Sequence, residues 1–293
     1  MNKAVALGYA HLTLRHLIRI SKVILRLPVE IQGRKYMKQL IDTSDSSLRI
    51  DVKSGYTRFD IRNIPELNAV FRKLQNLAGQ WLNDAESRRS GGFPVDLMLP
   101  SDLLDHPDIL ELALHDEFLV PASVYLGQVP RLAQLRMFWS PKNQTLTGSQ
   151  KFHYDHRDTS QIKIFLNLID ICEESGPLCF LPADMSSRFN SRIGYNQGRN
   201  EDDLVYSVCP SEALVINTGE AGRGVMVDTG RCLHYGSRQN KKDRLILMIG
   251  YIRPNCVKLE NRSRVLEPLR YEFAQSLFKN DPVRQYALTV TPR

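Results

Sequence analysis

The chain of 293 residues lacks several features that would place it in a simple class. Its five cysteines form no Cys-x-x-Cys pair and are odd in number, which argues against a disulfide framework and fits a reducing compartment. No uninterrupted apolar stretch reaches the roughly eighteen residues of a membrane span. Internal repeats and low-complexity runs are also absent. We therefore expect an ordinary globular protein with mostly buried thiols.

An excess of positive charge is confined to the N-terminus. The net charge is +7, from 39 basic and 32 acidic residues. Residues 1–40 contain eight Lys or Arg and a single acid, Glu30, so this segment accounts for the whole excess. The rest of the chain shows no basic face with interleaved aromatic residues, and we predict no nucleic-acid partner.

Residues 7–27 (LGYAHLTLRHLIRISKVILRL) have the pattern of an amphipathic helix that Pro28 is expected to close. Their basic side chains form a narrow stripe beside a wide apolar face. Such a helix can pack on a domain with its basic edge in water, lie on an anionic membrane surface, or be an organellar transit peptide. We expect a cytoplasmic protein, with peripheral membrane contact through residues 7–27 and an organellar location as alternatives.

The remaining sequence divides into helical and strand-like parts. Residues 64–89, 101–118 and 260–279 have helical spacing, whereas residues 186–210 look like a polar loop. From about residue 133, short apolar runs alternate with Gly, Pro, Asn and Asp: AQLRMFW, QIKIFLNLIDI, GPLCFLP, EALVIN, GVMVD and RLILMIGYI. These runs predict a β-sandwich or barrel flanked by helices. We divide the chain into a basic helix region, 1–39, and one domain, 40–293.

The stretch SQKFHYDHRD at 149–158 contains two overlapping His-x-Asp triplets, 153–155 and 156–158. Residues two apart on a strand share a face, so either triplet could point into a barrel. If Phe165 on the next strand faces the interior, a turn must precede that strand. HRDTSQ provides this turn when Asp155 is the ligand, whereas the second triplet leaves almost no room.

A His-x-Asp pair needs a third ligand from a distant strand, and His234 in DTGRCLHYGSRQNKKDR is suitably placed. The predicted metal ligands are His153, Asp155 and His234. Two histidines and one carboxylate form the facial triad that leaves positions open on Fe(II) for a bidentate cosubstrate and O₂. Arg244 opens the apolar strand RLILMIGYI, where a guanidinium can pair with the far carboxylate of a dicarboxylate that chelates the metal.

These segments resemble the phytanoyl-CoA dioxygenase-like branch of the Fe(II)- and 2-oxoglutarate-dependent oxygenases. The resemblance rests on FHYD at 152–155, SGPLCFLPADMS at 175–186 and LHYGSRQNKKDR at 233–244, and it covers roughly residues 133–253. It implies an α+β fold, a double-stranded β-helix (jelly roll, cupin-like) with flanking helices. It also implies Fe(II), 2-oxoglutarate and O₂ as cofactors, and a hydroxylation reaction. The substrate would be a small molecule, or a lipid or lipid-linked sugar if residues 7–27 contact a membrane.

The resemblance further implies roles for three cosubstrate-binding residues. Arg244 would hold the 2-oxoglutarate C5 carboxylate together with Ser237, although Tyr235 separates His234 from the Gly-Ser pair and departs from the family pattern. Lys163 is a third candidate, because some related oxygenases use a lysine on that strand; the alternative is a surface lysine on an edge strand. Two other functions are open: a zinc hydrolase with the same ligands, and a non-catalytic jelly-roll binding module.

Overall fold

The computed structural model describes residues 27–88, 93–99, 101–155, 159–195, 198–254 and 272–288. The predicted basic helix, its membrane contact and the second His-x-Asp triplet lie outside these residues. Within them, no helix has both the length and the apolar character needed to cross a membrane. Of the four cysteines described, Cys172 is exposed and the other three are buried as free thiols.

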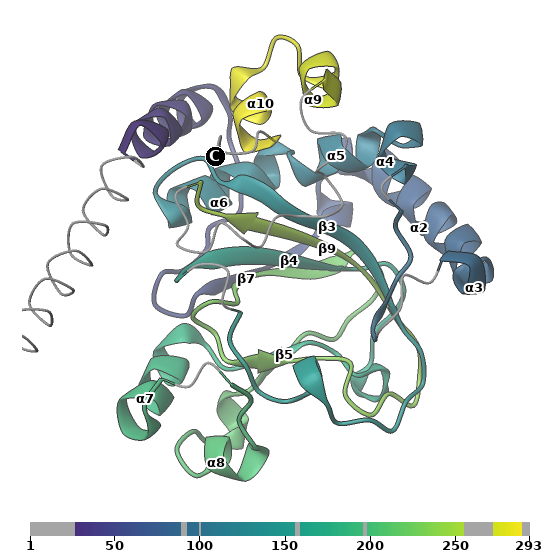
Figure 1. Cartoon of the computed structure of the whole chain (residues 1–293), viewed down its shortest axis with the longest axis vertical. Coiled ribbons are helices and arrows are strands. Elements are labelled where there is room, and N and C mark those ends of the chain that lie inside the picture. The colour runs from purple at the N-terminus through teal and green to yellow at the C-terminus, as the bar shows by residue number, and fades with distance from the viewer. Residues whose placement is uncertain are drawn as a thin grey trace, which may run out of the picture.

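Two antiparallel sheets form the centre of the molecule (Figure 1). The larger sheet has six strands in the order β1-β7-β4-β9-β3-β2, and the smaller has three in the order β6-β5-β8. An isolated bridge between His153 and His234 extends the smaller sheet. The strands are β1 (Tyr56–Asp60), β2 (Val95–Asp96), β3 (Arg131–Ser140), β4 (Gln161–Asn167), β5 (Cys179–Phe180), β6 (Val215–Ile216), β7 (Arg223–Asp228), β8 (His234–Tyr235) and β9 (Arg244–Ile252).

Alternate side chains of the larger sheet face two different layers. On β4, Ile162, Ile164 and Leu166 belong to a core shared with the helices. Phe165 instead packs with Phe180 of the smaller sheet. This alternation follows from the two-residue period of a strand, and it leaves a packed interior between two facing antiparallel sheets. The predicted α+β double-stranded β-helix is therefore confirmed, and Phe165 faces inward as the choice between the two triplets required.

Helices cover the outer faces of both sheets (Figure 1). The helical predictions at 64–89 and 101–118 correspond to α2 to α5 and the start of α6. The α-helices are α2 (Asn68–Asn83), α3 (Ala85–Arg88), α4 (Asp102–Asp105), α5 (Asp108–Ala113), α6 (Asp116–Leu126), α7 (Ala183–Ile193), α8 (Asp202–Tyr206), α9 (Glu272–Leu277) and α10 (Pro282–Leu288). Short 3₁₀ helices are η1 (Ile61–Asn63), η2 (Pro65–Leu67), η3 (Gly148–Gln150), η4 (Glu173–Ser175) and η5 (Ser211–Ala213).

One prediction of local structure lies outside the described residues and another is wrong. The helix that Pro28 was expected to close falls almost entirely on residues before 27, outside the described residues. Pro28 itself lies in a helix at 27–43, where the fixed φ of proline is compatible with a position whose N–H is not needed. The segment 186–210 was expected to be a loop, but it contains most of α7 and all of α8. Phe189 of α7 is fully buried against the smaller sheet together with Phe152 and Leu181. Because this is one large apolar side chain in an otherwise polar sequence, the segment shows little helical periodicity.

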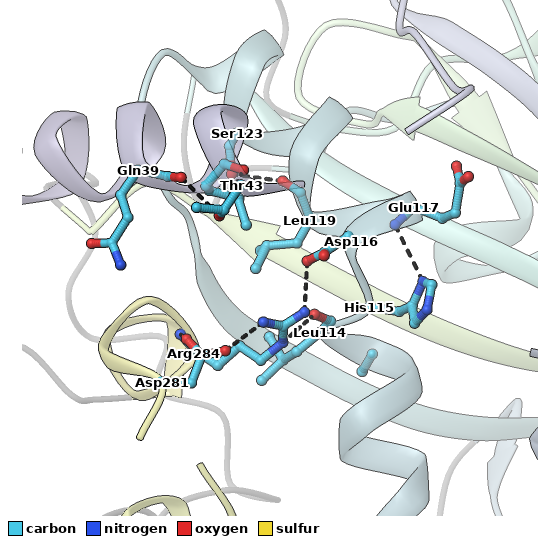
Figure 2. A network of polar contacts seen from close by, with 12 residues as sticks. Gln39, Thr43, Leu114, His115, Asp116, Glu117, Leu119, Ser123, Asp281 and Arg284 are labelled. Atoms are coloured by element: carbon cyan, nitrogen blue, oxygen red, sulfur yellow. Dashed lines mark hydrogen bonds and ion pairs between the residues drawn. The ribbon is translucent and has the colours of Figure 1, made fainter. Parts of the chain in front are cut away.

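The N-terminal and C-terminal helices pack on the same core. Arg284 of α10 forms ion pairs with Asp281 and with Asp116 at the start of α6 (Figure 2). Its Nε also donates to the carbonyl of Leu114. The helix at 27–43 contacts α10 through Tyr286, whose hydroxyl donates to the carbonyl of Val29 at 2.7 Å. That helix thus runs across the predicted boundary at residue 39.

Candidate metal centre

Three side chains from two adjoining segments converge between the sheets. One donor atom from each of His153, Asp155 and His234 lies within 4.8 Å of the other two. The backbone sets this arrangement, because His153 and His234 exchange two hydrogen bonds of 2.9 and 3.0 Å. The amide of Asp155 donates to the carbonyl of Thr229 at 2.9 Å. The structure thus brings together the three residues that the sequence predicts as ligands.

Alternation along residues 152–155 points the donors inward. Phe152 and Tyr154 are buried on the opposite side, in the cluster that includes residues of α7 and α8. The hydroxyl of Tyr154 donates to the carbonyl of Ser186 at 3.2 Å. With these two aromatic side chains fixed outside, the strand period directs His153 and Asp155 into the space between the sheets.

Both imidazoles are oriented and kept neutral by their surroundings. Nδ1 of His153 lies 2.9 Å from the carbonyl of Lys151, and Nδ1 of His234 lies 2.9 Å from the carbonyl of Cys232. A proton on Nδ1 satisfies these carbonyls and leaves Nε2 as an electron-pair donor. Burial, followed by the neighbouring His234, lowers the pKa of His153 to about 3. Burial also lowers the pKa of His234, so both rings have the protonation state that a metal ligand needs.

Asp155 forms an ion pair with a lysine in the sheet interior. Nζ of Lys163 lies 2.7 Å from Oδ2 of Asp155. Burial acts to raise the pKa of Asp155, but the ammonium of Lys163 more than offsets it, and the net result is a pKa well below the ordinary range. Because β4 lies between β7 and β9, it is not an edge strand. The alternative of a surface lysine at this position is therefore wrong.

Arg244 is a buried cation at the first position of β9. Its side chain is 5% exposed and donates to Oγ of Ser237 at 3.0 Å. Ser237 Oγ in turn lies 2.7 Å from Oγ of Ser140. In the described parts of the chain no carboxylate pairs with Arg244, and burial lowers its pKa to about 10. A guanidinium has several N–H donors, so most of its capacity for an anion is unused.

Ser237 reaches Arg244 despite the intervening Tyr235. Its backbone is held on both sides, because its N–H donates to the carbonyl of Gly176 at 2.9 Å and its own carbonyl accepts from Gln150 at 2.8 Å. These bonds maintain a φ of 58°, which is uncommon for a residue with a Cβ. The strained turn therefore keeps the hydroxyl beside the guanidinium.

A cavity of about 190 Å³ connects the triad with Lys163, Arg244 and Ser237. Its apolar wall is formed mainly by the inward-facing residues of β3, β4 and β9, namely Phe138, Phe165, Ile246 and Met248. The arrangement combines two nitrogen donors and one carboxylate on one side with an anion-binding guanidinium in the same space. This donor set suits iron and other divalent transition metals, and the guanidinium suits a ligand with a free carboxylate.

Asp228, which the sequence did not indicate, supports this centre through the turn that precedes His234. It ends β7 and is fully buried. The turn that it begins contains Thr229, the acceptor of the Asp155 amide, and leads to His234. Oδ2 of Asp228 accepts hydrogen bonds from the hydroxyls of Ser160 at 2.6 Å and Tyr125 at 3.0 Å. Oδ1 accepts from the backbone amides of Gln161 at 3.1 Å, Gly230 at 3.0 Å and Arg231 at 3.2 Å. Only the Asp-Thr-Gly turn signal could have indicated it.

Comparison with known proteins finds a likeness in structure only. No family model and no curated protein matches the chain. Among solved structures, the epimerase SnoN in complex with Fe³⁺, alpha ketoglutarate and nogalamycin RO is 18% identical over 69% of this chain and 80% of its own, with a TM-score of 0.47. The non-heme alpha ketoglutarate dependent carbocyclase SnoK is 18% identical over 73% and 86%, at 0.48.

EctD from S. alaskensis, solved with bound Fe, is 16% identical over 70% of this chain and 76% of its own, with a TM-score of 0.49. At such identities a shared arrangement of strands does not say which reaction this chain performs. The function must therefore be argued from the side chains of the cavity.

Proposed function

We propose that this protein is an Fe(II)- and 2-oxoglutarate-dependent oxygenase, of the phytanoyl-CoA dioxygenase-like kind, that hydroxylates a small-molecule, lipid or lipid-linked sugar substrate. The observation that carries the proposal is the shared cavity of the His153–Asp155–His234 triad and Arg244, a buried guanidinium without a carboxylate partner in the described chain. A zinc hydrolase could use the same three ligands, but it would have no need of this buried cation.

The donor set fits iron in its chemistry. His153 and His234 would bind through Nε2, and Asp155 through its carboxylate. When bound, iron and 2-oxoglutarate supply the oxidising chemistry, in which O₂ and 2-oxoglutarate are converted to succinate and CO₂ while one oxygen atom is inserted into a substrate C–H bond. We favour hydroxylation over halogenation because Asp155 holds the coordination position that a halide would need.

The other side chains would bind and orient the cosubstrate. Arg244 would form a bidentate pair with its distal carboxylate, and Ser237 would keep the guanidinium in place. The apolar wall would limit water around this pair, which strengthens it. Lys163 is the third predicted cosubstrate-binding residue, and its ammonium pairs with Asp155.

The proposal is tested by supplying Fe(II), 2-oxoglutarate and O₂ to the purified protein and measuring succinate. Uncoupled formation of succinate is expected without added substrate. His153→Ala and Asp155→Ala should abolish both this reaction and metal binding, whereas His156→Ala is a matched control from the same short stretch. Succinate formation that survives loss of His153 would contradict the ligand set. Metal binding without succinate would favour a binding module, and hydrolysis by the zinc form would favour a hydrolase.

A further inference from the structure

The cavity contains two cationic side chains at different ends. Lys163 and Arg244 are the only Lys or Arg residues among the described residues that line it. In the β4–β9 register Lys163 lies opposite Gly250, six residues beyond Arg244 along β9. At about 3.3 Å per residue, the two backbone positions are about 20 Å apart along the sheet. The two cationic side chains therefore enter the cavity from opposite ends of β9.

When metal and 2-oxoglutarate are both bound, one of the two cations in the cavity has no anion to pair with. Among the described residues that line the cavity, the one carboxylate is Asp155, which pairs with Lys163. In the proposed function, a divalent metal takes the charges of Asp155 and of the chelating cosubstrate carboxylate, and Arg244 takes the distal carboxylate. Lys163 then loses its full counter-charge although its side chain is only 12% exposed. A buried ammonium without an anion is unfavourable, so the complete complex calls for one more negative group.

A polar side chain lies close to Lys163. Opposite Lys163, Gly250 has no side chain, and the side chain of Gln134 fills that space, because a Cβ at Gly250 would come within 3.0 Å of Cβ and 3.1 Å of Oε1 of Gln134. Gln134, which lies in register with Gly250 on the other side, lines the same cavity with its carboxamide. An oxyanion at this end can therefore meet an ammonium and an amide N–H donor together.

A third cationic side chain, that of Arg199, lies outside the lining of the cavity. Arg199 is exposed, and the amide of the next residue, Asn200, donates to the carbonyl of Phe152 at 2.8 Å, which places Arg199 beside the triad strand. It is close enough to contribute to the lowered pKa of His153 and of His234. Where the structure describes the chain, no carboxylate pairs with it. Its charge would attract anions toward the centre.

We infer that Lys163 binds an oxyanion of the oxygenase's primary substrate, a carboxylate or phosphate group, and thereby makes the enzyme specific for acidic substrates. The inference rests on the proposed function. Because the ammonium lies 2.7 Å from a carboxylate oxygen of the ligand Asp155, the bound anion lies next to the metal. The oxidised carbon is therefore only a few bonds from the acidic group. The small volume of the cavity agrees with entry of the acidic end alone.

The test uses protein loaded with Mn(II) and saturated with 2-oxoglutarate, in which no turnover occurs. The probe is 4,4,4-trifluorobutyrate, and 4,4,4-trifluorobutanamide is its neutral counterpart. Paramagnetic relaxation of the fluorine signal reports binding near Mn(II). The carboxylate should be relaxed about tenfold more strongly than the amide. Lys163→Met should reduce the relaxation of the carboxylate probe to the level of the amide probe, and Lys163→Arg should restore it. Lys242→Met, at an exposed lysine paired with Glu174, is the control and should change nothing.

Calorimetric titration of 2-oxoglutarate into the Mn(II)-loaded protein separates the two possible roles of Lys163. The affinity for 2-oxoglutarate should change by less than about threefold in Lys163→Met and fall strongly in Arg244→Met. If both variants lose the same amount of affinity for 2-oxoglutarate, Lys163 binds the cosubstrate and the inference is wrong. Equal relaxation of the carboxylate and amide probes in the native protein would also overturn the inference. Failure of the native protein to bind Mn(II) and 2-oxoglutarate would overturn the proposed function itself, and with it this inference.

Discussion

Replacement of Arg244 by methionine should stabilise the ligand-free protein and remove its response to 2-oxoglutarate. Methionine retains much of the side-chain volume but brings no charge into the cavity. The pKa of Arg244 falls from 12.5 to about 10 on folding, which corresponds to about 3 kcal/mol against the folded state. The sign follows from protonation: the unfolded chain holds this proton more tightly, so the penalty is complete at neutral pH and is relieved only above about pH 10.

Loss of the hydrogen bond to Ser237 offsets about 1 kcal/mol of this gain. The metal-free Arg244→Met protein should therefore be more stable by about 2 kcal/mol, which in a chain of this size raises Tm by roughly 3 °C. In the native protein loaded with Mn(II), 2-oxoglutarate at about a hundred times its Kd should add about 2.7 kcal/mol. The variant should show no such gain.

Thermal unfolding of the native and variant proteins, each with and without 2-oxoglutarate, measures both effects. Arg223→Met, at an exposed arginine that begins β7, is the control and should change stability by less than about 0.5 kcal/mol. A variant that is less stable than the native protein and still gains from 2-oxoglutarate would show that Arg244 is a structural residue rather than an anion-binding one.

Three further predictions concern other parts of the chain. Asp228→Asn should lower stability by about 3 kcal/mol and weaken Mn(II) binding, because an amide cannot accept all five hydrogen bonds; unchanged Mn(II) affinity on calorimetric titration would refute the supporting role. His153 should lower the stability of the metal-free protein by about 2 kcal/mol between pH 7.5 and pH 5. The reason is that His153 binds a proton below about pH 6.5 in the unfolded chain, whereas in the folded chain its pKa is about 3. Urea unfolding should show a weaker pH dependence of stability in His153→Asn. Deletion of residues 1–26 should abolish salt-sensitive sedimentation with anionic vesicles if the basic helix contacts membranes, whereas equal sedimentation of both proteins would exclude it.

The sequence was sufficient for the strands whose side chains alternate over many residues. QIKIFLN and RLILMIGYI each have one face toward the helices and one toward the cavity, and the positions of Lys163 and Arg244 follow from that period. The first His-x-Asp triplet could be chosen because a turn had to fit before the next strand. By contrast, β2 has only two residues, too few for any period to be visible.

Contacts between distant residues could not be predicted in the same way. Asp228 receives hydrogen bonds from Tyr125 and Ser160, which lie 103 and 68 positions away in sequence. Neither partner has a local pattern that points to it. The ion pair between Lys163 and Asp155 was also missed, since alternation gives the face of a side chain but not its partner across the cavity. Networks of this kind depend on tertiary packing, and a single sequence does not encode them in short-range spacing.

The direct backbone pairing of His153 with His234 has a consequence for metal selectivity in a cell. Two of the three proposed ligands are neighbours in a sheet, so an incoming ion meets a preorganised pair and does not have to order the chain around itself. Chelation should then leave a folded apoprotein that can be reloaded. A rigid site of this kind discriminates little between divalent metal ions. The affinity of nitrogen and oxygen ligands for these ions rises from iron to copper and remains high for zinc. The protein would be exposed to mismetallation, and its activity would depend on which ions the cell makes available.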